Sequence, residues 1–435
     1  MKTIHRTMAV ITGCVAMMSV SGALAQDWPQ WRGANRDAKV TGFAAPKTWP
    51  KELTQRWKAT VGLGDATPAL AGERLYVFAR QEVEEVTRCL DAGSGKVLWA
   101  DRYAVQAISG PDAGQHSGPR SSPAVAQGKV VTLGVSGHLS CLDAATGKVL
   151  WRKDDFPGAW PRFHVASSPI LVDGLCIAQL GKETEGAIVA YDLATGDLRW
   201  KWADEGPGYA SPALLSVGGD KIIIAQTAQS VVGLLAASGK TVWKTPFAAQ
   251  GMSYNAATPI VDGQTVIYCG QGRGAAAVRI EKQGGSFAAK ELWKNPDNAV
   301  QFNSPVLKDG FLYGLSARGD FFCINAQDGK TAWTAPFSPP GAGAEAQPQG
   351  QGPGGARAGR GMGRTAGYGS IVDAGSALLA LTPASQLVAF EPSPKAYSEL
   401  ARIKVAETPT YAYPIVSGKR VFVKDQDSVT LWTFE

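Results

Sequence analysis

Short runs of alternating apolar and polar residues recur along the chain, and each leads through a turn into a second run that closes on tryptophan. The clearest copy is LDAATGKVLW, from Leu142 to Trp151. Alternation over about four to eight residues is typical of a half-buried β-strand. Asp143 and Gly147 suit the intervening turn, because Asp accepts hydrogen bonds from turn amides and Gly tolerates a positive φ. Each copy therefore predicts a strand, a tight turn and a second strand.

The tryptophan that closes each copy is predicted to be a packing anchor. Its ring buries roughly 150–250 Å², which is sufficient reason for a repeat to retain it without any chemistry. The predicted structural anchors are Trp57, Trp99, Trp151, Trp200, Trp243, Trp293 and Trp333.

A second marker of the repeat is Ser or Thr followed by Pro, an apolar run and a Gly turn. Most markers stand about 45 residues apart, a period that, with four short strands per unit, is typical of propeller blades. Eight markers predict an all-β fold, an eight-bladed β-propeller of four-stranded antiparallel blades. The markers begin at Thr67, Ser122, Ser168, Ser211, Thr258 and Ser304, with weaker copies at Ser370 and Tyr413.

The two ends of the repeat region complement each other. The last unit, which begins at Pro414, has only three predicted strands, whereas the segment from Leu53 to Lys58 is a Trp-bearing fourth strand without a blade of its own. We expect this N-terminal strand to join the last blade and close the ring, because closure covers edges that an open sheet would expose. The predicted propeller spans residues 53–435.

The first residues have the features of a targeting signal. Lys2 and Arg6 precede an apolar run, and Ala23-Leu24-Ala25 is a suitable cleavage site before Gln26. Residues 1–25 are therefore predicted to be a signal peptide, and the mature chain is expected to be exported to the periplasm or the extracellular space. The alternative is a lipid anchor at Cys14, in a loose lipobox. No later stretch has the length of a transmembrane segment.

Two further segments fall outside the repeat. Residues 26–52 are predicted to be an extended N-terminal arm that packs on the propeller; Trp28 and Trp31 within it are alternatively candidates for stacking a ligand. Residues 338–367, between blades six and seven, are rich in Gly, Pro and Arg and almost free of apolar side chains. This insertion is predicted to be disordered, as a surface loop or, alternatively, as a tether for an acidic partner.

The overall charge excludes one class of partner. The chain has 435 residues, 43 Lys and Arg against 37 Asp and Glu, and a formal net charge of +6. For a chain of this size, that excess is too small to indicate a nucleic-acid-binding protein. The 45% of apolar residues indicates a globular chain with a large core.

The segments between each Trp strand and the next marker, together with the turns between second and third strands, are expected to emerge on one face of the ring, where they form a funnel. Aromatic and amide side chains dominate these segments, as in sites that bind peptides, sugars or other polar ligands; the alternative is that several of them only plug the central channel. The predicted funnel residues are His116, Arg120, Trp160, Arg162, His164, Tyr209, Tyr254, Asn255, Gln301, Phe302, Asn303, Tyr368, Tyr411 and Tyr413.

Catalytic and metal-binding residues are not predicted. His116, His138 and His164 lack the spacing of metal ligands. The funnel contains no general-base pair with a recognisable spacing. Asp65, a carboxylate directly before a marker, is on its own only a weak candidate for a general base.

Taken together, the TGKxxW repeats and the export signal resemble the pyrroloquinoline-quinone (PQQ) repeat family. Its members include quinoprotein dehydrogenases and the outer-membrane assembly propeller BamB, and this chain is similar to the latter in size and layout. The DWPQWRG segment that begins at Asp27 also resembles the opening of many exported repeat proteins. The resemblance extends from Thr54 to Glu435 and implies the fold, whereas function depends on what lines the propeller.

The resemblance has specific implications for cofactors. Family dehydrogenases bind PQQ and a calcium ion held by Glu, Asn and Asp, use an Asp as base, and commonly carry a disulfide between adjacent cysteines. This sequence has no Cys-Cys pair. We therefore expect no cofactor, with PQQ and calcium as the alternative.

Three functions follow as hypotheses. The leading one is a monomeric, non-catalytic propeller that binds an envelope protein or peptide partner, as the resemblance to BamB implies. The second is a small-molecule or polysaccharide-binding module in which Trp160, Tyr209 and Tyr254 form a stacking platform. The third is a PQQ-dependent dehydrogenase.

Overall fold

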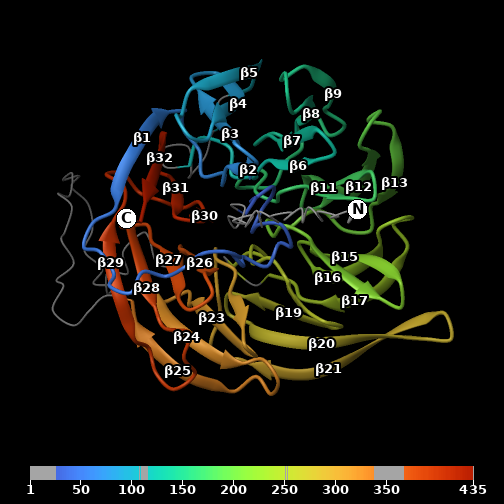
Figure 1. Cartoon of the computed structure of the whole chain (residues 1–435). Helices are drawn as coiled ribbons and strands as arrows, with labels where there is room; N and C mark the ends of the chain where they lie inside the picture. The colour runs from blue at the N-terminus through green and yellow to red at the C-terminus, as the bar shows by residue number, and fades with distance from the viewer. Residues whose placement is uncertain are drawn as a thin grey trace, which may run out of the picture.

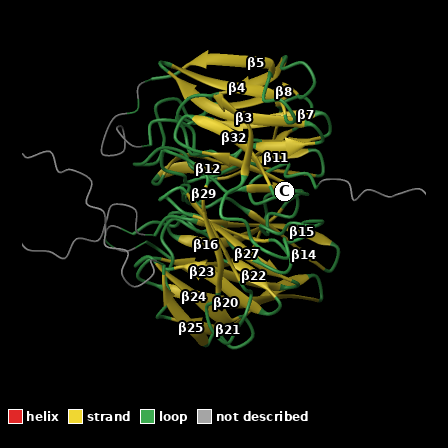
Figure 2. Ribbon diagram, turned by 60° about the vertical axis from the view of Figure 1, so that its left-hand side comes forward, coloured by secondary structure: helices red, strands yellow, loops and turns green. Residues whose placement is uncertain are grey.

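Eight four-stranded antiparallel sheets surround a central axis and form a closed β-propeller (Figure 1). The structure is a computed structural model that describes residues 26–106, 108, 116–249, 251, 253–337 and 367–434. Seen from the side in Figure 2, these residues form strands and connecting loops only. The predicted fold class is therefore confirmed. None of the described residues belongs to a helix that could cross a membrane.

The first four blades follow the chain in order, and each runs from an inner to an outer strand. Blade one comprises β2 (Ala69–Ala71), β3 (Arg74–Gln81), β4 (Glu84–Asp91) and β5 (Val97–Ala104). Blade two comprises β6 (Ala124–Ala126), β7 (Lys129–Leu133), β8 (Leu139–Asp143) and β9 (Val149–Lys153). Blade three comprises β10 (Ile170–Val172), β11 (Leu175–Lys182), β12 (Glu185–Asp192) and β13 (Leu198–Trp202). Blade four comprises β14 (Ala213–Val217), β15 (Asp220–Gln226), β16 (Ser230–Leu235) and β17 (Thr241–Pro246).

The next three blades repeat this order, and the eighth takes one strand from the start of the chain. Blade five comprises β18 (Ile260–Asp262), β19 (Thr265–Gly270), β20 (Gly274–Gln283) and β21 (Ser286–Asn295). Blade six comprises β22 (Val306–Lys308), β23 (Phe311–Leu315), β24 (Asp320–Asn325) and β25 (Thr331–Pro336). Blade seven comprises β26 (Ser370–Asp373), β27 (Leu378–Leu381), β28 (Gln386–Phe390) and β29 (Glu399–Lys404). Blade eight comprises β30 (Ile415–Ser417), β31 (Arg420–Lys424), β32 (Ser428–Thr433) and β1 (Thr54–Thr60).

Closure of the ring occurs where the sequence predicts it. β1 pairs antiparallel with β32, from Thr54 opposite Thr433 to Thr60 opposite Ser428. This pairing covers the hydrogen-bonding edge of β32 and joins the two ends of the chain in one sheet. Trp57 on β1 thereby occupies the position that Trp151 occupies on β9.

Burial falls from the inner strands of a blade to its outer strand. The central residues of β3 and β4 are buried on both faces, because each blade is packed between two neighbours, whereas exposed and half-buried residues alternate along β5. The alternating pattern that is visible in the sequence therefore belongs mainly to the outer strands. The apolar runs belong to the middle of each blade.

The repeated tryptophans connect consecutive blades. The indole of Trp151 donates a hydrogen bond from Nε1 to the Leu193 carbonyl of blade three at 3.1 Å. Its ring covers Gly196, where an added Cβ would lie 2.7 Å from Trp151 Cγ. The same pairing with a glycine of the next blade occurs at Trp57, Trp99, Trp200 and Trp293. The two exceptions are Trp243, which bonds Thr245, and Trp333, which bonds Ser393.

The Ser/Thr-Pro markers form hydrogen bonds around the channel. The Ser122 amide donates to Ser168 Oγ at 2.9 Å, and the Ser168 amide donates to Ser211 Oγ at 2.9 Å. The same bond joins blade five to blade six and, through Thr67, blade eight to blade one. The hydroxyl of one marker thus satisfies the amide of the preceding blade, which explains why Ser or Thr precedes the proline.

The N-terminal arm is coiled, and the prediction of an extended conformation is wrong. Positive φ angles at Arg32, Gly33, Arg36 and Ala38 turn the chain repeatedly. Only isolated bridges, such as Trp28 with Leu70, pair it with the propeller. The prediction that the arm packs on the body is correct, and the place is the central channel (Figure 1).

The arm contacts all eight blades. Its backbone bonds Leu70 of blade one, Val125 of blade two and Asp373 of blade seven. Its side chains reach blades three and four through Arg36, blade six through Arg32, and blades five and eight through Trp31. Trp28, Arg32 and Arg36 are almost completely buried. The channel is therefore filled by the arm.

Several predicted features lie outside the described residues. These are the signal peptide over 1–25, with the alternative lipid anchor at Cys14, and the insertion over 338–367 except for Gly367.

Candidate functional site

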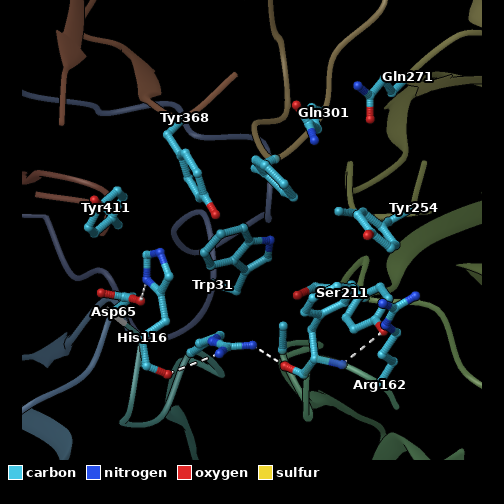
Figure 3. Close-up of a pocket in the computed structure, with 16 residues that line it drawn as sticks. Trp31, Asp65, His116, Arg162, Ser211, Tyr254, Gln271, Gln301, Tyr368 and Tyr411 are labelled. Atoms are coloured by element: carbon cyan, nitrogen blue, oxygen red, sulfur yellow. Dashed lines mark hydrogen bonds and ion pairs between the residues drawn. The ribbon is translucent and has the colours of Figure 1, made fainter. Parts of the chain in front are cut away.

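A pocket of about 600 Å³ opens at the mouth of the filled channel. Trp31, in the N-terminal arm, lies at the centre of the ring of side chains in Figure 3 and forms the floor. The walls come from the segments that precede the markers, as the repeat pattern predicts for a funnel. A concave aromatic cavity with few polar groups is the usual form of a ligand-binding site.

Nine of the fourteen predicted funnel residues line this pocket. They are His116, Arg120, Arg162, Tyr209, Tyr254, Gln301, Phe302, Tyr368 and Tyr411. They come from segments far apart in the sequence, which the eight-fold arrangement brings to one face.

Three of the other predicted residues support the walls from behind. Asn255 is buried and donates from Nδ2 to the carbonyls of Thr227 and Phe247. Asn303 is buried and donates from Nδ2 to the carbonyls of Leu315 and Gly367. These amides satisfy loop carbonyls that would otherwise be buried without a partner. Tyr413 is also buried, and its ring lies edge-on to Trp31 with 5.0 Å between centroids.

Trp160 and His164 do not line the pocket. A turn closes this loop, with a φ of 64° at His164 and a hydrogen bond from the His164 amide to the Pro161 carbonyl. Arg162 and Phe163, within the turn, line the pocket, whereas Trp160 and His164 do not. Trp160 stacks on His164 and lines a separate cavity of about 310 Å³ beside His138. The predicted platform of Trp160, Tyr209 and Tyr254 is therefore not assembled.

The pocket also contains residues that the sequence pattern did not place in the funnel. Trp31 and Asp65 were candidates on other grounds, whereas Phe163, Ser211 and Gln271 were not predicted. Phe163 lies between two predicted residues and could have been included on that ground. Gln271 belongs to the turn between β19 and β20, the second and third strands of blade five. The repeat pattern predicts such turns on this face, but it does not distinguish Gln271 itself.

Four rings follow one another around part of the wall. Tyr254, Phe302, Tyr368 and His116 are nearly parallel to their neighbours, with interplanar angles of 19°, 21° and 24° in turn. Rings that stack along a wall turn their edges toward the cavity, and the hydroxyl of Tyr368 points toward Trp31 in Figure 3. Aromatic edges carry partial positive charge. This part of the wall is therefore suited to electron-rich groups.

His116 and Asp65 form a hydrogen-bonded dyad in the wall. His116 Nδ1 lies 2.6 Å from Asp65 Oδ2 (Figure 3). An ionised carboxylate only accepts hydrogen bonds, so a hydrogen bond to ionised Asp65 requires the proton of the imidazole on Nδ1. Tyr411 lies edge-on to the same imidazole, with centroids 4.7 Å apart. The dyad fixes the ring orientation and leaves Nε2 as the nitrogen that is not bonded to Asp65.

Two arginines give the pocket positive charge. Arg120 is held by the carbonyls of His116 and Phe163. Arg162 is exposed, and its guanidinium lies 5.3 Å from the ring centroid of Phe163. The backbone amide of Arg162 donates to Glu183, which also accepts from the Tyr209 hydroxyl at 2.9 Å. Burial, and next the Glu183 carboxylate, raises the pKa of Tyr209.

More positive charge lies below the floor. Arg36 donates to the carbonyls of Pro212 at 2.7 Å and Pro169 at 3.1 Å, and Arg32 donates to that of Pro305 at 2.7 Å. Among the described residues, no carboxylate forms an ion pair with either guanidinium. Burial and then the charge of Arg32 lower the pKa of Arg36 to about 9, so Arg36 stays protonated at neutral pH.

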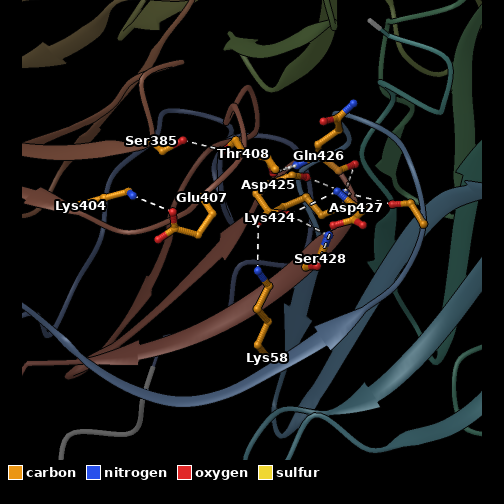
Figure 4. Close-up of polar contacts among 11 residues, drawn as sticks. Lys58, Ser385, Lys404, Glu407, Thr408, Lys424, Asp425, Gln426, Asp427 and Ser428 are labelled. Carbon is orange, nitrogen blue, oxygen red and sulfur yellow. Dashed lines mark hydrogen bonds and ion pairs between the residues drawn. The ribbon is translucent and has the colours of Figure 1, made fainter. Parts of the chain in front are cut away.

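A buried lysine stands behind the loop that carries Asp65. Lys424 donates from Nζ to the carbonyls of Gly62, Asp425 and Gln426 (Figure 4). Burial lowers the pKa of Lys424 to about 8, against the opposing charges of Asp65, Asp425 and Asp427. Three carbonyls thus hold the ammonium in place beside the pocket wall.

Comparison with known proteins finds similarity both to BamB proteins and to quinoprotein dehydrogenases. A family model described as outer membrane protein assembly factor BamB matches residues 46–201 and 83–335. BamB of Burkholderia pseudomallei (strain K96243) is 24% identical over 65% of this chain and 69% of its own length. Quinohemoprotein alcohol dehydrogenase of Comamonas testosteroni is 30% identical over 35% of this chain, and the match spans only 22% of the enzyme.

Among solved structures, the crystal structure of quinohemoprotein alcohol dehydrogenase from Comamonas testosteroni is similar, with a TM-score of 0.66 and 15% identity. The alignment covers 94% of this chain and 80% of that one. At this identity the likeness concerns the fold alone. The propeller is therefore shared with proteins of different function, and the residues of the pocket must decide between them.

The pocket does not fit the calcium–quinone pair of the dehydrogenases. Calcium takes about six to eight oxygen ligands, several of them carboxylates, whereas Asp65 is the one carboxylate among the described residues that line this pocket, and it is bonded to His116. No group of three His, Cys, Asp or Glu among the described residues is arranged to hold a metal ion. Cys89, Cys141, Cys176, Cys269 and Cys323 are free and buried in different strands. We therefore derive no reaction through a quinone.

Proposed function

The chain belongs to the family described as outer membrane protein assembly factor BamB, and from this premise we propose that it is an exported propeller that binds a protein or peptide partner in the cell envelope. The pocket at the channel mouth is the proposed site of contact. The proposal includes export of the mature chain and a non-catalytic role.

The observation that carries the proposal is the filled channel beneath an open aromatic pocket. The arm contacts every blade, so the ring and its floor form one rigid support for the loops of one face. Binding residues positioned by loops on a rigid scaffold are the usual arrangement in recognition proteins. Aromatic residues and arginine, which dominate this pocket, are also the residue types that most often contribute strongly to protein–protein binding.

Site-specific photo-crosslinking in cells of the source organism tests the proposal. A photoreactive amino acid at Gln301, on the pocket wall, is expected to give discrete adducts with an envelope polypeptide. The matched control is the same amino acid at Leu292, which is 41% exposed on the outer strand β21. Adducts from position 292 and none from position 301 would contradict the proposed site.

A further inference from the structure

The shape of the pocket indicates which part of a polypeptide enters it. Below Trp31 the channel is occupied by the arm, in which Trp28 is fully buried and Arg32 and Arg36 are nearly so. A chain that enters from the mouth therefore has no exit through the ring. A pocket of about 600 Å³ that is open at the mouth and closed below by the arm accommodates the end of a chain more readily than the middle of one.

The charge of the pocket indicates which end of a polypeptide enters it. Arg162 and Arg120 stand at the wall, and Arg32 and Arg36 lie buried beneath the floor. Among the described residues, none accepts a hydrogen bond from the Arg162 guanidinium, whose position is set by the Phe163 ring and by the bond of its own backbone to Glu183. The one carboxylate among the described lining residues, Asp65, is bonded to His116, and Glu183 behind the wall accepts from the Arg162 amide and the Tyr209 hydroxyl. The surplus positive charge favours a carboxylate over an ammonium group.

The walls indicate what accompanies the carboxylate. Trp31, Tyr254, Phe302 and Tyr368 provide apolar surface, and the stacked rings of the wall present their positive edges. Such a wall receives an apolar or aromatic side chain, and it disfavours a cationic one, which requires ring faces. The His116 Nε2 atom, directed by Asp65, is available to accept from a peptide amide.

We propose that this pocket binds the free C-terminal carboxylate of a partner polypeptide whose last residue is apolar or aromatic. Arg162 is the residue that pairs with the carboxylate, and the aromatic wall holds the last side chain. The inference rests on the proposed function and specifies the partner segment.

The test is calorimetric titration of the mature protein with two hexapeptides that end in phenylalanine, one with a free carboxylate and one with a C-terminal amide. We expect the acid to bind about tenfold or more tightly than the amide at low ionic strength, because a charge-assisted hydrogen bond is lost with the carboxylate. Arg162→Gln is expected to remove this preference. The matched control is Arg318→Gln, because Arg318 is an exposed arginine of the β23–β24 turn that does not line the pocket.

Five results would overturn the inference. Four are equal binding of acid and amide, binding of neither, an unchanged preference in Arg162→Gln, and an equal loss in Arg318→Gln. The fifth is an affinity for N-acetylphenylalanine equal to that for the acid peptide, which would assign the pocket to free small acids instead of a chain end. If a polypeptide still crosslinks through position 301 while acid and amide bind alike, the proposed function stands and the inference about the terminus fails.

Discussion

Trp99 of the first blade lies with its indole ring on Gly147 of the second, and its Nε1 donates to the Ala144 carbonyl at 3.2 Å. A Cβ on Gly147 would lie 2.5 Å from Trp99 Cε3, and the φ of Gly147 is +75°. The turn glycine of the repeat is thus required twice, once for its backbone conformation and once for the approach of the neighbouring tryptophan. Sequence repeat and blade packing therefore have the same cause.

The first prediction concerns this contact. We expect Gly147→Ala to lower the free energy of unfolding by about 2–4 kcal/mol, because the added methyl group displaces Trp99 and strains the turn. The matched control is Gly174→Ala, where φ is +76° and no atom lies within 4 Å of the added carbon. In that variant the free energy of unfolding is expected to fall by only about 1–2 kcal/mol. Equal losses in chemical denaturation would show that the contact with Trp99 contributes nothing.

The second prediction concerns the arm. Arg36→Ala removes the donor that serves the buried carbonyls of Pro169 and Pro212 in adjacent blades. Because buried carbonyls without a hydrogen-bond donor destabilise the folded state, we expect Arg36→Ala to lower the free energy of unfolding by about 2–4 kcal/mol. Arg56→Ala provides the control, because Arg56 is exposed on β1, and its expected effect is within about 0.5 kcal/mol. Thermal unfolding curves that coincide for the two variants would refute a bridging role for Arg36.

The third prediction concerns pH. The pKa of Lys424 is lowered from 10.5 to about 8 in the folded protein. Between these values the unfolded chain binds more protons than the folded chain, so the contribution of Lys424 to stability rises with pH. We expect the stability of the natural protein relative to Lys424→Met to increase by about 3 kcal/mol from pH 7.5 to 10.5. Chemical denaturation of both proteins across this range measures the difference, and a difference independent of pH would contradict it.

The fold could be predicted because each blade is a local unit. The strands that pair within blade two are neighbours in the sequence, so the alternation and the turn residues around Asp143 determine their register. The closure of the ring by β1 could be predicted from the number of strands at the two ends of the chain. The arm carries no repeat, and its conformation depends on contacts with eight blades at once. Its sequence therefore indicated packing and did not indicate the channel.

The site could be predicted only as a region. Placement of loops on one face follows from the repeat, whereas the direction of each side chain depends on individual turns. Trp160 and Arg162 are two residues apart, yet Trp160 precedes the turn from Pro161 to His164 and Arg162 lies within it, and the two residues line different cavities. Asp65 and His116 are 51 residues apart and meet because two loops of different blades converge. No spacing rule covers such a pair.

The last prediction concerns that pair. If Asp65 accepts from His116 Nδ1, neutral His116 is held as the Nδ1-protonated tautomer, whereas a histidine without such a partner has no reason to retain it. The whole chain has only 4 His, so long-range ¹⁵N–¹H spectra of histidine-labelled protein are sparse, and loss of one signal in His116→Gln assigns His116. We expect Asp65→Ala to change the tautomer of His116 and leave His138 unaffected. Asp154→Ala is the matched control, because Asp154 lies 3.6 Å from His138 Nε2 and should perturb His138 alone. A His116 spectrum identical in the natural protein and Asp65→Ala would show that the carboxylate does not orient the ring. In that case the role of Nε2 as an acceptor for a peptide amide would have no structural basis.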